Sequence, residues 1–175
     1  KHNQVSLAVV NTPLSIVFSG EVAPILKLQE ELKAKEIKSQ KVNVSQAFHS
    51  PMMSEASQEL TEVVKKVKRS KPQIPIMSNV TGTWMSEKQV NDDEYWGTHM
   101  RECVYFSDNI EGLLAKSPSN VIEVGANTIL TTAMRSFTEK LDDKPLVIPS
   151  SRHPKDTSTN DAQALDNVIA QIWAN

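Results

Sequence analysis

The chain has 175 residues, of which 39% are hydrophobic and 23% charged, and its formal net charge is −2. This length fits one ordinary domain of about 100–200 residues with enough apolar residues to bury a core. The weak charge, with lysines scattered among glutamates, excludes a basic field for nucleic acid or anionic lipid, so neither partner is expected. Cys103 is the single cysteine, and no apolar run approaches the ~20 residues of a membrane-crossing helix. We therefore expect a cytoplasmic protein without an intrachain disulfide.

The first 45 residues are predicted to form a strand–strand–helix–strand region of α+β type. Lys1-His2-Asn3-Gln4 has neither a start methionine nor the apolar core of a signal peptide, which indicates a fragment. The short Asn11-Thr12-Pro13 segment between two β-rich runs predicts a hairpin. The four predicted elements are the strands Val5–Val10 and Leu14–Ser19, the amphipathic helix Val22–Glu36 and the strand Lys41–Ser45.

From residue 46 onward, predicted strands and helices alternate, which is typical of α/β layering around a parallel sheet. Ser50-Pro51 fits an N-cap followed by proline at the first helical position, so His49 should lie just before a helix. The later elements are predicted at Ile74–Val80 (strand), Thr81-Gly82-Thr83 (turn), Asp108–Lys116 (helix), Asn120–Val124 (strand), Thr128–Lys140 (helix) and Leu146–Ile148 (strand). After a polar linker, Pro149–Asp161, a last helix is expected at Ala162–Trp173.

The histidines are the residues of greatest chemical interest. They are His2, His49, His99 and His153, and their spacing and neighbours do not fit a metal site, so no metal is expected. The five glycines form neither a phosphate loop nor a G-x-S-x-G elbow, so no nucleophile can be assigned from a motif. A histidine placed like His49 is more often structural than catalytic. A helix amino terminus disfavours imidazolium, however, so His49 would tend to stay neutral and able to accept a proton.

The segment around His49 also resembles a known motif. Val44-Ser45-Gln46-Ala47-Phe48-His49-Ser50-Pro51-Met52-Met53 is similar to the histidine motif of type I polyketide-synthase acyltransferases. Further segments resemble other signatures of that family in the family's order: Val9–Pro13, Ile16–Gly20, Ser78–Gly82, Tyr95–Phe106, Glu123–Leu130, Ile148–Arg152 and Trp173. Cys103 and Ala126-Asn127 depart from the pattern. The chain therefore resembles the carboxyl-terminal half of a malonyl-type acyltransferase domain of a modular type I polyketide synthase.

The resemblance implies a fold and a set of partners. The fold class would be α/β, with part of an α/β-hydrolase-like large subdomain at 46–148 and part of a small ferredoxin-like α+β subdomain at 1–45. Residues 149–175 would be the linker and docking helix that follow. No bound cofactor is implied, and coenzyme A or phosphopantetheine thioesters would be acyl donor and acceptor. The implied partners are the amino-terminal half with the nucleophilic serine, an acyl carrier protein and neighbouring synthase domains, so this fragment alone should be inactive.

The resemblance also implies a catalytic role for His49. The family transfers an acyl group from coenzyme A to a serine and then to a carrier-protein thiol, in a ping-pong reaction with histidine as general base. His49 matches that histidine. In the family a main-chain carbonyl usually holds the second ring nitrogen, and we expect this carbonyl within Pro118–Val121.

Three residues match substrate-binding positions. Phe48 stands where family members that load malonyl have phenylalanine and those that load methylmalonyl usually have serine, because a phenyl ring leaves little room for an α-substituent; core packing is the alternative. Gln46 replaces the usual histidine and could hydrogen-bond a polar substituent, so hydroxymalonyl delivered by a carrier protein stays a rival extender. Asn11 matches the asparagine near the acyl and pantetheine chain, or only forms the turn. A non-catalytic docking or scaffold fragment with a structural His49 is the remaining alternative.

Overall fold

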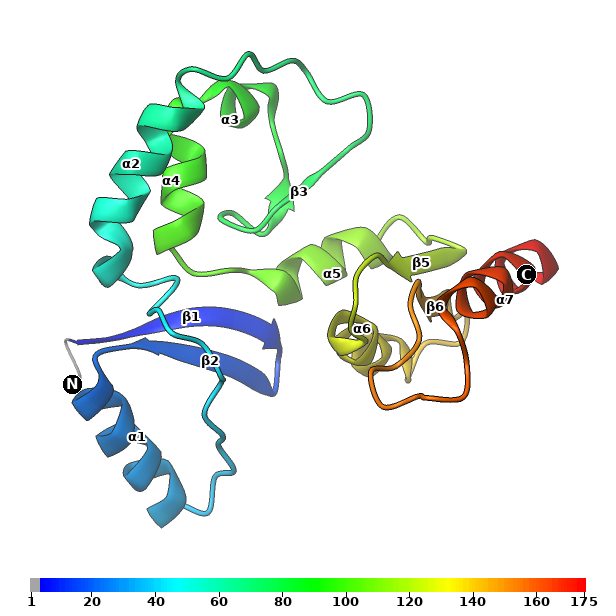
Figure 1. Ribbon diagram of the computed structural model, residues 1–175, viewed down its shortest axis with the longest axis horizontal. Helices are drawn as coiled ribbons and strands as arrows, with labels where there is room; N and C mark the ends of the chain where they lie inside the picture. Colours follow the sequence, from blue (N-terminus) through cyan, green and yellow to red (C-terminus); the bar gives the residue numbers. More distant parts are fainter. Residues whose placement is uncertain (1–3) are drawn as a thin grey trace. The chain divides into compact units, whose positions relative to one another are not determined.

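The computed structural model describes residues 4–175 (Figure 1). His2, one of the four histidines considered above, lies outside the described residues. The chain forms two compact units, residues 1–109 and residues 110–175. The mixture of paired strands and covering helices is an α/β fold, as the sequence predicts.

The first unit begins with an antiparallel hairpin. β1 (Val5–Thr12) pairs with β2 (Ser15–Gly20). The Leu14 N–H donates to Oγ1 of Thr12 at 3.2 Å, so a threonine hydroxyl closes the turn. The predicted hairpin is confirmed, with each strand shifted slightly at its ends.

β1 has a second neighbour along its other edge. The Val10 N–H donates to the Val104 carbonyl and the Val104 N–H donates to the Ala8 carbonyl, both at 2.9 Å. These bonds form a short parallel bridge, and Ala8 beneath it is only 2% exposed. β1 is therefore bonded on both sides, to β2 and to the segment around Val104.

Helix α1 (Val22–Ala34) follows the hairpin and confirms the predicted surface helix. No residue of α1, all of which lies in the described range, is buried. The predicted strand at Lys41–Ser45 is wrong, because this segment is irregular and leaves Val42 and Val44 more than half exposed. A strand needs a neighbouring strand for its N–H and C=O groups. Here the Val44 N–H instead turns back to the Val42 carbonyl at 3.0 Å.

His49 leads into a short 3₁₀ helix, η1 (Pro51–Met53), and helix α2 (Ser54–Val64). Oγ of Ser50 accepts from the Met52 N–H at 3.3 Å, which confirms the predicted cap. α2 lies along α4 (Asp93–Arg101), as Figure 1 shows. Gly97 permits this close approach, because a Cβ at that position would lie 2.5 Å from the Ser57 carbonyl oxygen.

A small hairpin and a short helix connect α2 to α4. β3 (Met77–Ser78) and β4 (Thr83–Trp84) are antiparallel around the predicted turn at Gly82, and α3 (Glu87–Asn91) follows. The strand predicted at Ile74–Val80 is therefore only two residues long. The sequence analysis placed no helix at α3 or α4. The signals were present, since Ser86 and Gln89 form a capping box and Asp92 caps α4.

The second unit contains a parallel β–α–β arrangement. Helix α5 (Phe106–Leu114) leads from the first unit into the second. β5 (Asn120–Glu123) and β6 (Leu146–Pro149) pair in parallel, with helix α6 (Ile129–Thr138) between them in the chain. The last helix is α7 (Asp161–Ala174). The predicted parallel pairing and the predicted helices of this unit are confirmed, with small shifts at their ends.

Each unit has a core of its own. Buried hydrophobic residues of the first unit are Ala8, Met53, Val90 and Tyr95, and those of the second are Ile110, Met134, Val147, Ile148 and Val168. The domain boundaries predicted after residues 45 and 148 stay predictions. No helix within residues 4–175 is long and apolar enough to cross a membrane.

Candidate active site

His49 is held in an uncommon backbone conformation at the start of η1. Its φ angle is +58°, in the left-handed region that few non-glycine residues adopt. The His49 N–H donates to the Met100 carbonyl at 3.0 Å, and Oγ of Ser50 donates to the Ala47 carbonyl at 2.6 Å. Ser50 is 1% exposed. These bonds fix the loop that carries the His49 ring.

The ring of His49 is oriented by a main-chain carbonyl. Nδ1 of His49 lies 3.0 Å from the carbonyl oxygen of Glu102, 53 residues away in the sequence. A carbonyl can only accept, so Nδ1 carries the proton and Nε2 presents a lone pair. The expectation of a carbonyl in Pro118–Val121 is therefore wrong, whereas the expectation of a carbonyl partner is confirmed. The last turn of a helix leaves carbonyls unsatisfied, and α4 ends beside His49.

Two helix ends of opposite polarity flank His49. The start of η1 carries partial positive charge, which was the basis of the sequence-level expectation of a neutral ring. At the carboxyl end of α4, the Met100 carbonyl accepts from the His49 N–H and the Glu102 carbonyl accepts from its Nδ1–H. Nε2 is therefore the ring nitrogen that can accept a proton while Nδ1–H stays bonded. This is the arrangement that a general base requires.

A second histidine lies beside the first. The ring centroids of His49 and His99 are 6.0 Å apart at an interplanar angle of 62°. His99 stacks on Tyr95, with centroids 6.5 Å apart and rings 3° from parallel. Burial, and to a smaller extent the nearby His49, hold the pKa of His99 below its usual value. No role was predicted for His99. The four-residue spacing from Tyr95 would have placed both rings on one face if α4 had been predicted.

The three predicted substrate-binding residues also belong to the first unit. Phe48 is 44% exposed next to His49. Gln46 is exposed on the same loop. Asn11 is half-buried in a β-bulge of β1, between the Val10–Ile16 and Thr12–Ser15 pairs. The turn bond belongs to Thr12, and within residues 4–175 no hydrogen bond joins Asn11 or Gln46 to His49.

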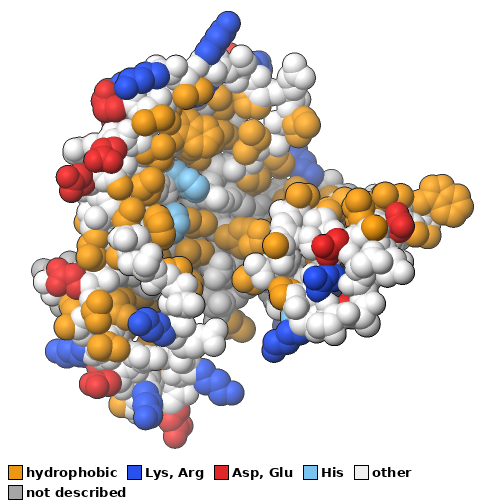
Figure 2. All heavy atoms as spheres, in the orientation of Figure 1, with side chains coloured by type: hydrophobic (Ala, Val, Ile, Leu, Met, Phe, Trp, Pro, Cys, Tyr) orange, Lys and Arg blue, Asp and Glu red, His pale blue; other side chains and the backbone are white. Residues whose placement is uncertain are grey.

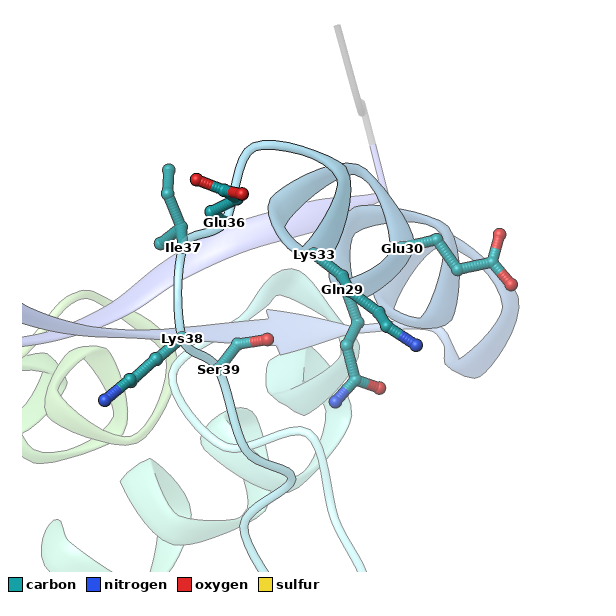
Figure 3. Close-up of a pocket in the computed structure, with 7 residues that line it drawn as sticks. All are labelled: Gln29, Glu30, Lys33, Glu36, Ile37, Lys38 and Ser39. Carbon is teal, nitrogen blue, oxygen red and sulfur yellow. The ribbon is translucent and has the colours of Figure 1, made fainter.

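The most evident hollows lie away from these residues. A hollow of about 520 Å³ lies where the last turns of α1 face the segment that follows the helix (Figure 3). Its lining is mostly charged or polar: Gln29, Glu30, Lys33, Glu36, Ile37, Lys38 and Ser39. A second hollow, of about 480 Å³, lies in the second unit. Neither contains His49 or a predicted substrate-binding residue. In the part of the chain that the structure describes, no cluster of His, Cys, Asp and Glu could hold a metal ion.

The fold and the site together define an α/β domain with a histidine ring held by a main-chain carbonyl. Comparison with known families is consistent with this chemistry, because the family described as "Acyl transferase domain" matches residues 1–171. The chain belongs to this family. The resemblance expected from the motifs is thereby confirmed.

The similar proteins include polyketide synthases. The chain is 31% identical over 173 residues to the spectinabilin polyketide synthase system protein NorB of Streptomyces orinoci, covering 96% of the chain and 8% of NorB. It is 32% identical over 149 residues to the polyketide synthase GfsE of Streptomyces halstedii, covering 85% of the chain and 4% of GfsE. The chain thus spans a small share of these relatives.

Solved structures show the same fold. The acyltransferase domain from the second module of the salinomycin polyketide synthase has a TM-score of 0.88 at 28% identity, covering 98% of this chain and 39% of that one. The malonyl CoA-acyl carrier protein transacylase from Clostridium perfringens has a TM-score of 0.81 at 25% identity, covering 97% of this chain and 49% of that one. The chain therefore corresponds to less than half of each of these solved structures.

Proposed function

We propose that the chain is the carboxyl-terminal part of a polyketide-synthase acyltransferase domain that loads a malonyl-type extender unit onto an acyl carrier protein. The observation that carries this proposal is the state of His49. Its Nδ1–H is bonded to the Glu102 carbonyl, and within residues 4–175 its Nε2 has no hydrogen-bond partner. Nε2 is therefore free to take a proton from a nucleophile.

His49 would act in both halves of a ping-pong reaction. Nε2 takes the serine proton while the serine oxygen attacks the thioester carbonyl, and the imidazolium returns that proton to the departing coenzyme A sulfur. In the second half, Nε2 takes the proton of the phosphopantetheine thiol, the sulfur attacks the acyl-serine ester, and the proton passes to the departing serine oxygen. The Glu102 carbonyl and the end of α4 stabilise the imidazolium in each half.

The nucleophilic serine would be supplied by the amino-terminal half of the domain. The similarity covers 39% of the salinomycin-synthase domain structure, which leaves a large part of that fold without a counterpart in this chain. The hairpin and α1 expose large hydrophobic side chains that a further layer could cover, namely Leu7, Leu14, Ile16, Phe18, Val22 and Leu26. Figure 2 shows how widely hydrophobic side chains reach the surface of the face in view. The chain alone should form no acyl-enzyme.

Phe48 and Gln46 would select the extender unit. Both are exposed on the loop that carries His49, where we propose that the acyl group attached to the serine lies. A phenyl ring at this place favours malonyl over methylmalonyl on steric grounds. Gln46 could instead recognise a hydroxyl, and the acyltransferase domain of SpnD, 25% identical at a TM-score of 0.89, is described in complex with 2-(pent-4-yn-1-yl)malonyl. Substituted malonyl groups therefore stay candidates.

Replacement of His49 tests the proposed function. In the domain reconstituted with its amino-terminal half, His49→Asn should lower self-acylation by malonyl-coenzyme A ~10²–10⁴-fold. Asparagine tolerates the left-handed backbone better than alanine, so the loop is preserved. His153→Asn, in the polar linker of the second unit, is the matched control. Intact-mass spectrometry measures the acyl adduct. Undiminished acylation by the His49 variant would favour the non-catalytic docking fragment.

A competition experiment tests the extender. Malonyl, methylmalonyl and carrier-bound hydroxymalonyl are offered together, and the mass shift on the serine-bearing peptide is read. Phe48→Ser should relax the preference for malonyl over methylmalonyl by ~10–200-fold, the range of one methylene-sized steric difference. Gln46→Leu should abolish a hydroxymalonyl preference if the amide recognises the hydroxyl. Preferential methylmalonyl loading by the unmodified domain would contradict both roles.

A further inference from the structure

A chain of hydrogen bonds fixes the ring of His99 beside His49. Nδ2 of Asn109 donates to Oδ1 of Asn79 at 2.6 Å, and Nδ2 of Asn79 lies 3.2 Å from Nε2 of His99. Asn109 is 6% exposed, and the main-chain carbonyl of Asn79 accepts from the Tyr105 N–H at 2.8 Å. The side-chain amide of Asn109 is therefore buried, and the backbone of Asn79 is fixed by a hydrogen bond. In this series Asn109 donates to Asn79, and Asn79 donates to His99.

With the two amides in this orientation, Asn79 presents its Nδ2 to Nε2 of His99 and Oδ1 of buried Asn109 has no hydrogen-bond partner. An amide nitrogen can only donate, so Nε2 of His99 accepts and the ring proton of a neutral His99 resides on Nδ1. A proton on Nε2 would place two donors against each other. Burial acts in the same direction, since it disfavours the charged ring. His99 therefore stays uncharged at the edge of the base.

We propose that His99 is a positioning residue of the acyl transfer: its neutral ring, oriented by Asn79 and Asn109, supports the ring of His49 in contact with the Glu102 carbonyl. The proposal rests on the proposed function of His49. Both rings lie at the carboxyl end of α4: His99 belongs to the helix, and His49 lies on the loop that contacts the Glu102 carbonyl. Tyr95 stacks on His99, and the Tyr95 hydroxyl is bonded to Oγ of Ser78 at 2.8 Å.

The neutral state of His99 has a consequence for the reaction. His49 must carry a positive charge after it accepts the serine proton. A second positive charge about 6 Å away would oppose that step, whereas an uncharged ring supplies contact without repulsion. The Asn79 and Asn109 amides thus favour an uncharged His99 ring beside His49.

The first test needs no substitution. In the ¹⁵N-labelled reconstituted domain, imidazole NMR should show His99 protonated at Nδ1 and bare at Nε2, and should show a hydrogen-bonded Nδ1–H on His49. Asn79→Leu should release His99 into a mixture of tautomers. Asn91→Leu, the same change at an exposed residue of α3, should not. A His99 that carries its proton on Nε2 in the unmodified domain would require both amides to be reversed and would overturn the assignment.

The second test measures the effect on the base. His99→Ala should lower the single-turnover acylation rate per active site by about 10-fold, because a misplaced catalytic group costs up to ~10²-fold. It should also broaden the Nδ1–H resonance of His49. His99→Phe keeps a neutral ring and should restore most of the rate and the resonance. An unchanged rate and resonance in His99→Ala, with the His49→Asn variant inactive, would overturn this inference alone. Full activity of His49→Asn would overturn the proposed function.

Discussion

Helices α4 and α1 belong to the same unit of the chain but are covered very differently. α4 buries Tyr95 and Gly97 and lies so close to α2 that only glycine fits at the contact. α1 buries none of its described residues, and β2 beside it leaves Ile16 half exposed. The chain therefore supplies both sides of the packing around His49 but only one side of the packing around α1. Substitutions should accordingly cost much near the base and little along α1.

The largest effect is expected from Gly97→Ala. A Cβ at this position would lie 2.4 Å from Oγ1 of Thr61 and 2.5 Å from the Ser57 carbonyl oxygen, so α2 and α4 must move apart. We expect the free energy of unfolding to fall by about 1–3 kcal/mol despite the better helix propensity of alanine. Gly125→Ala is the control, since nothing lies within 4 Å of its added Cβ. Urea denaturation of the reconstituted domain measures both, and equal effects would contradict the close contact.

A pair of valine substitutions compares the two regions directly. Val90 of α3 is 6% exposed, whereas Val22 of α1 is 74% exposed. Val90→Ala should lower the free energy of unfolding by about 1.5 kcal/mol, from two methyl groups at ~0.8 kcal/mol each. Val22→Ala should change it by less than about 0.5 kcal/mol in the isolated chain. A larger loss at Val22 once the amino-terminal half is added would show that the half covers α1.

Tyr95→Phe removes one buried hydrogen bond without changing the packing. The hydroxyl is bonded to Oγ of Ser78, which is completely buried. The expected loss in the free energy of unfolding is about 1 kcal/mol. Tyr105→Phe, at a residue that is 37% exposed, should be close to neutral. Thermal unfolding of the two variants, measured side by side, checks the difference.

The smallest effect on the free energy of unfolding is expected at Glu123, whose carboxylate accepts hydrogen bonds from the start of α6. Burial raises the pKa of the Glu123 carboxyl, but hydrogen bonds from Thr131 and Leu130 lower it by more, so the net pKa lies below the ordinary 4.5. The ionised carboxylate therefore stabilises the fold above pH 4.5, and this contribution is lost as the pH falls through the pKa of the folded protein. Glu123→Gln should therefore lessen the acid sensitivity of unfolding in this range. Glu139→Gln, at the other end of α6, should leave it unchanged.

Local patterns in the sequence predicted much of the fold. The hairpin, the Ser50 cap, α6 and the parallel pairing of β5 with β6 each follow from turn chemistry, capping or periodicity within a few residues. The prediction of a strand at Lys41–Ser45 was wrong because β-branched residues do not form a strand without a neighbouring strand to pair with. α3 and α4 were missed although their caps were readable, since neither helix has a long apolar repeat.

The candidate site was predictable only in part. The motif directed attention to His49 because it lies within ten consecutive residues, and the roles predicted for His49 and Phe48 stay predictions. The Glu102 carbonyl could not be found in this way, because it reaches His49 from 53 residues away and any residue type provides a carbonyl. His99 escaped notice for a similar reason. Its relation to His49 exists only once α4 is folded against the loop.

The short bridge between β1 and Val104 joins the hairpin to the segment that contacts His49. Only Cys103 separates Val104 from Glu102, whose carbonyl holds the His49 ring. A movement of the hairpin that keeps the two bonds at Val104 therefore displaces a residue only two positions from Glu102. Hydrogen exchange at the Val10 and Val104 amides would report how often the bridge opens.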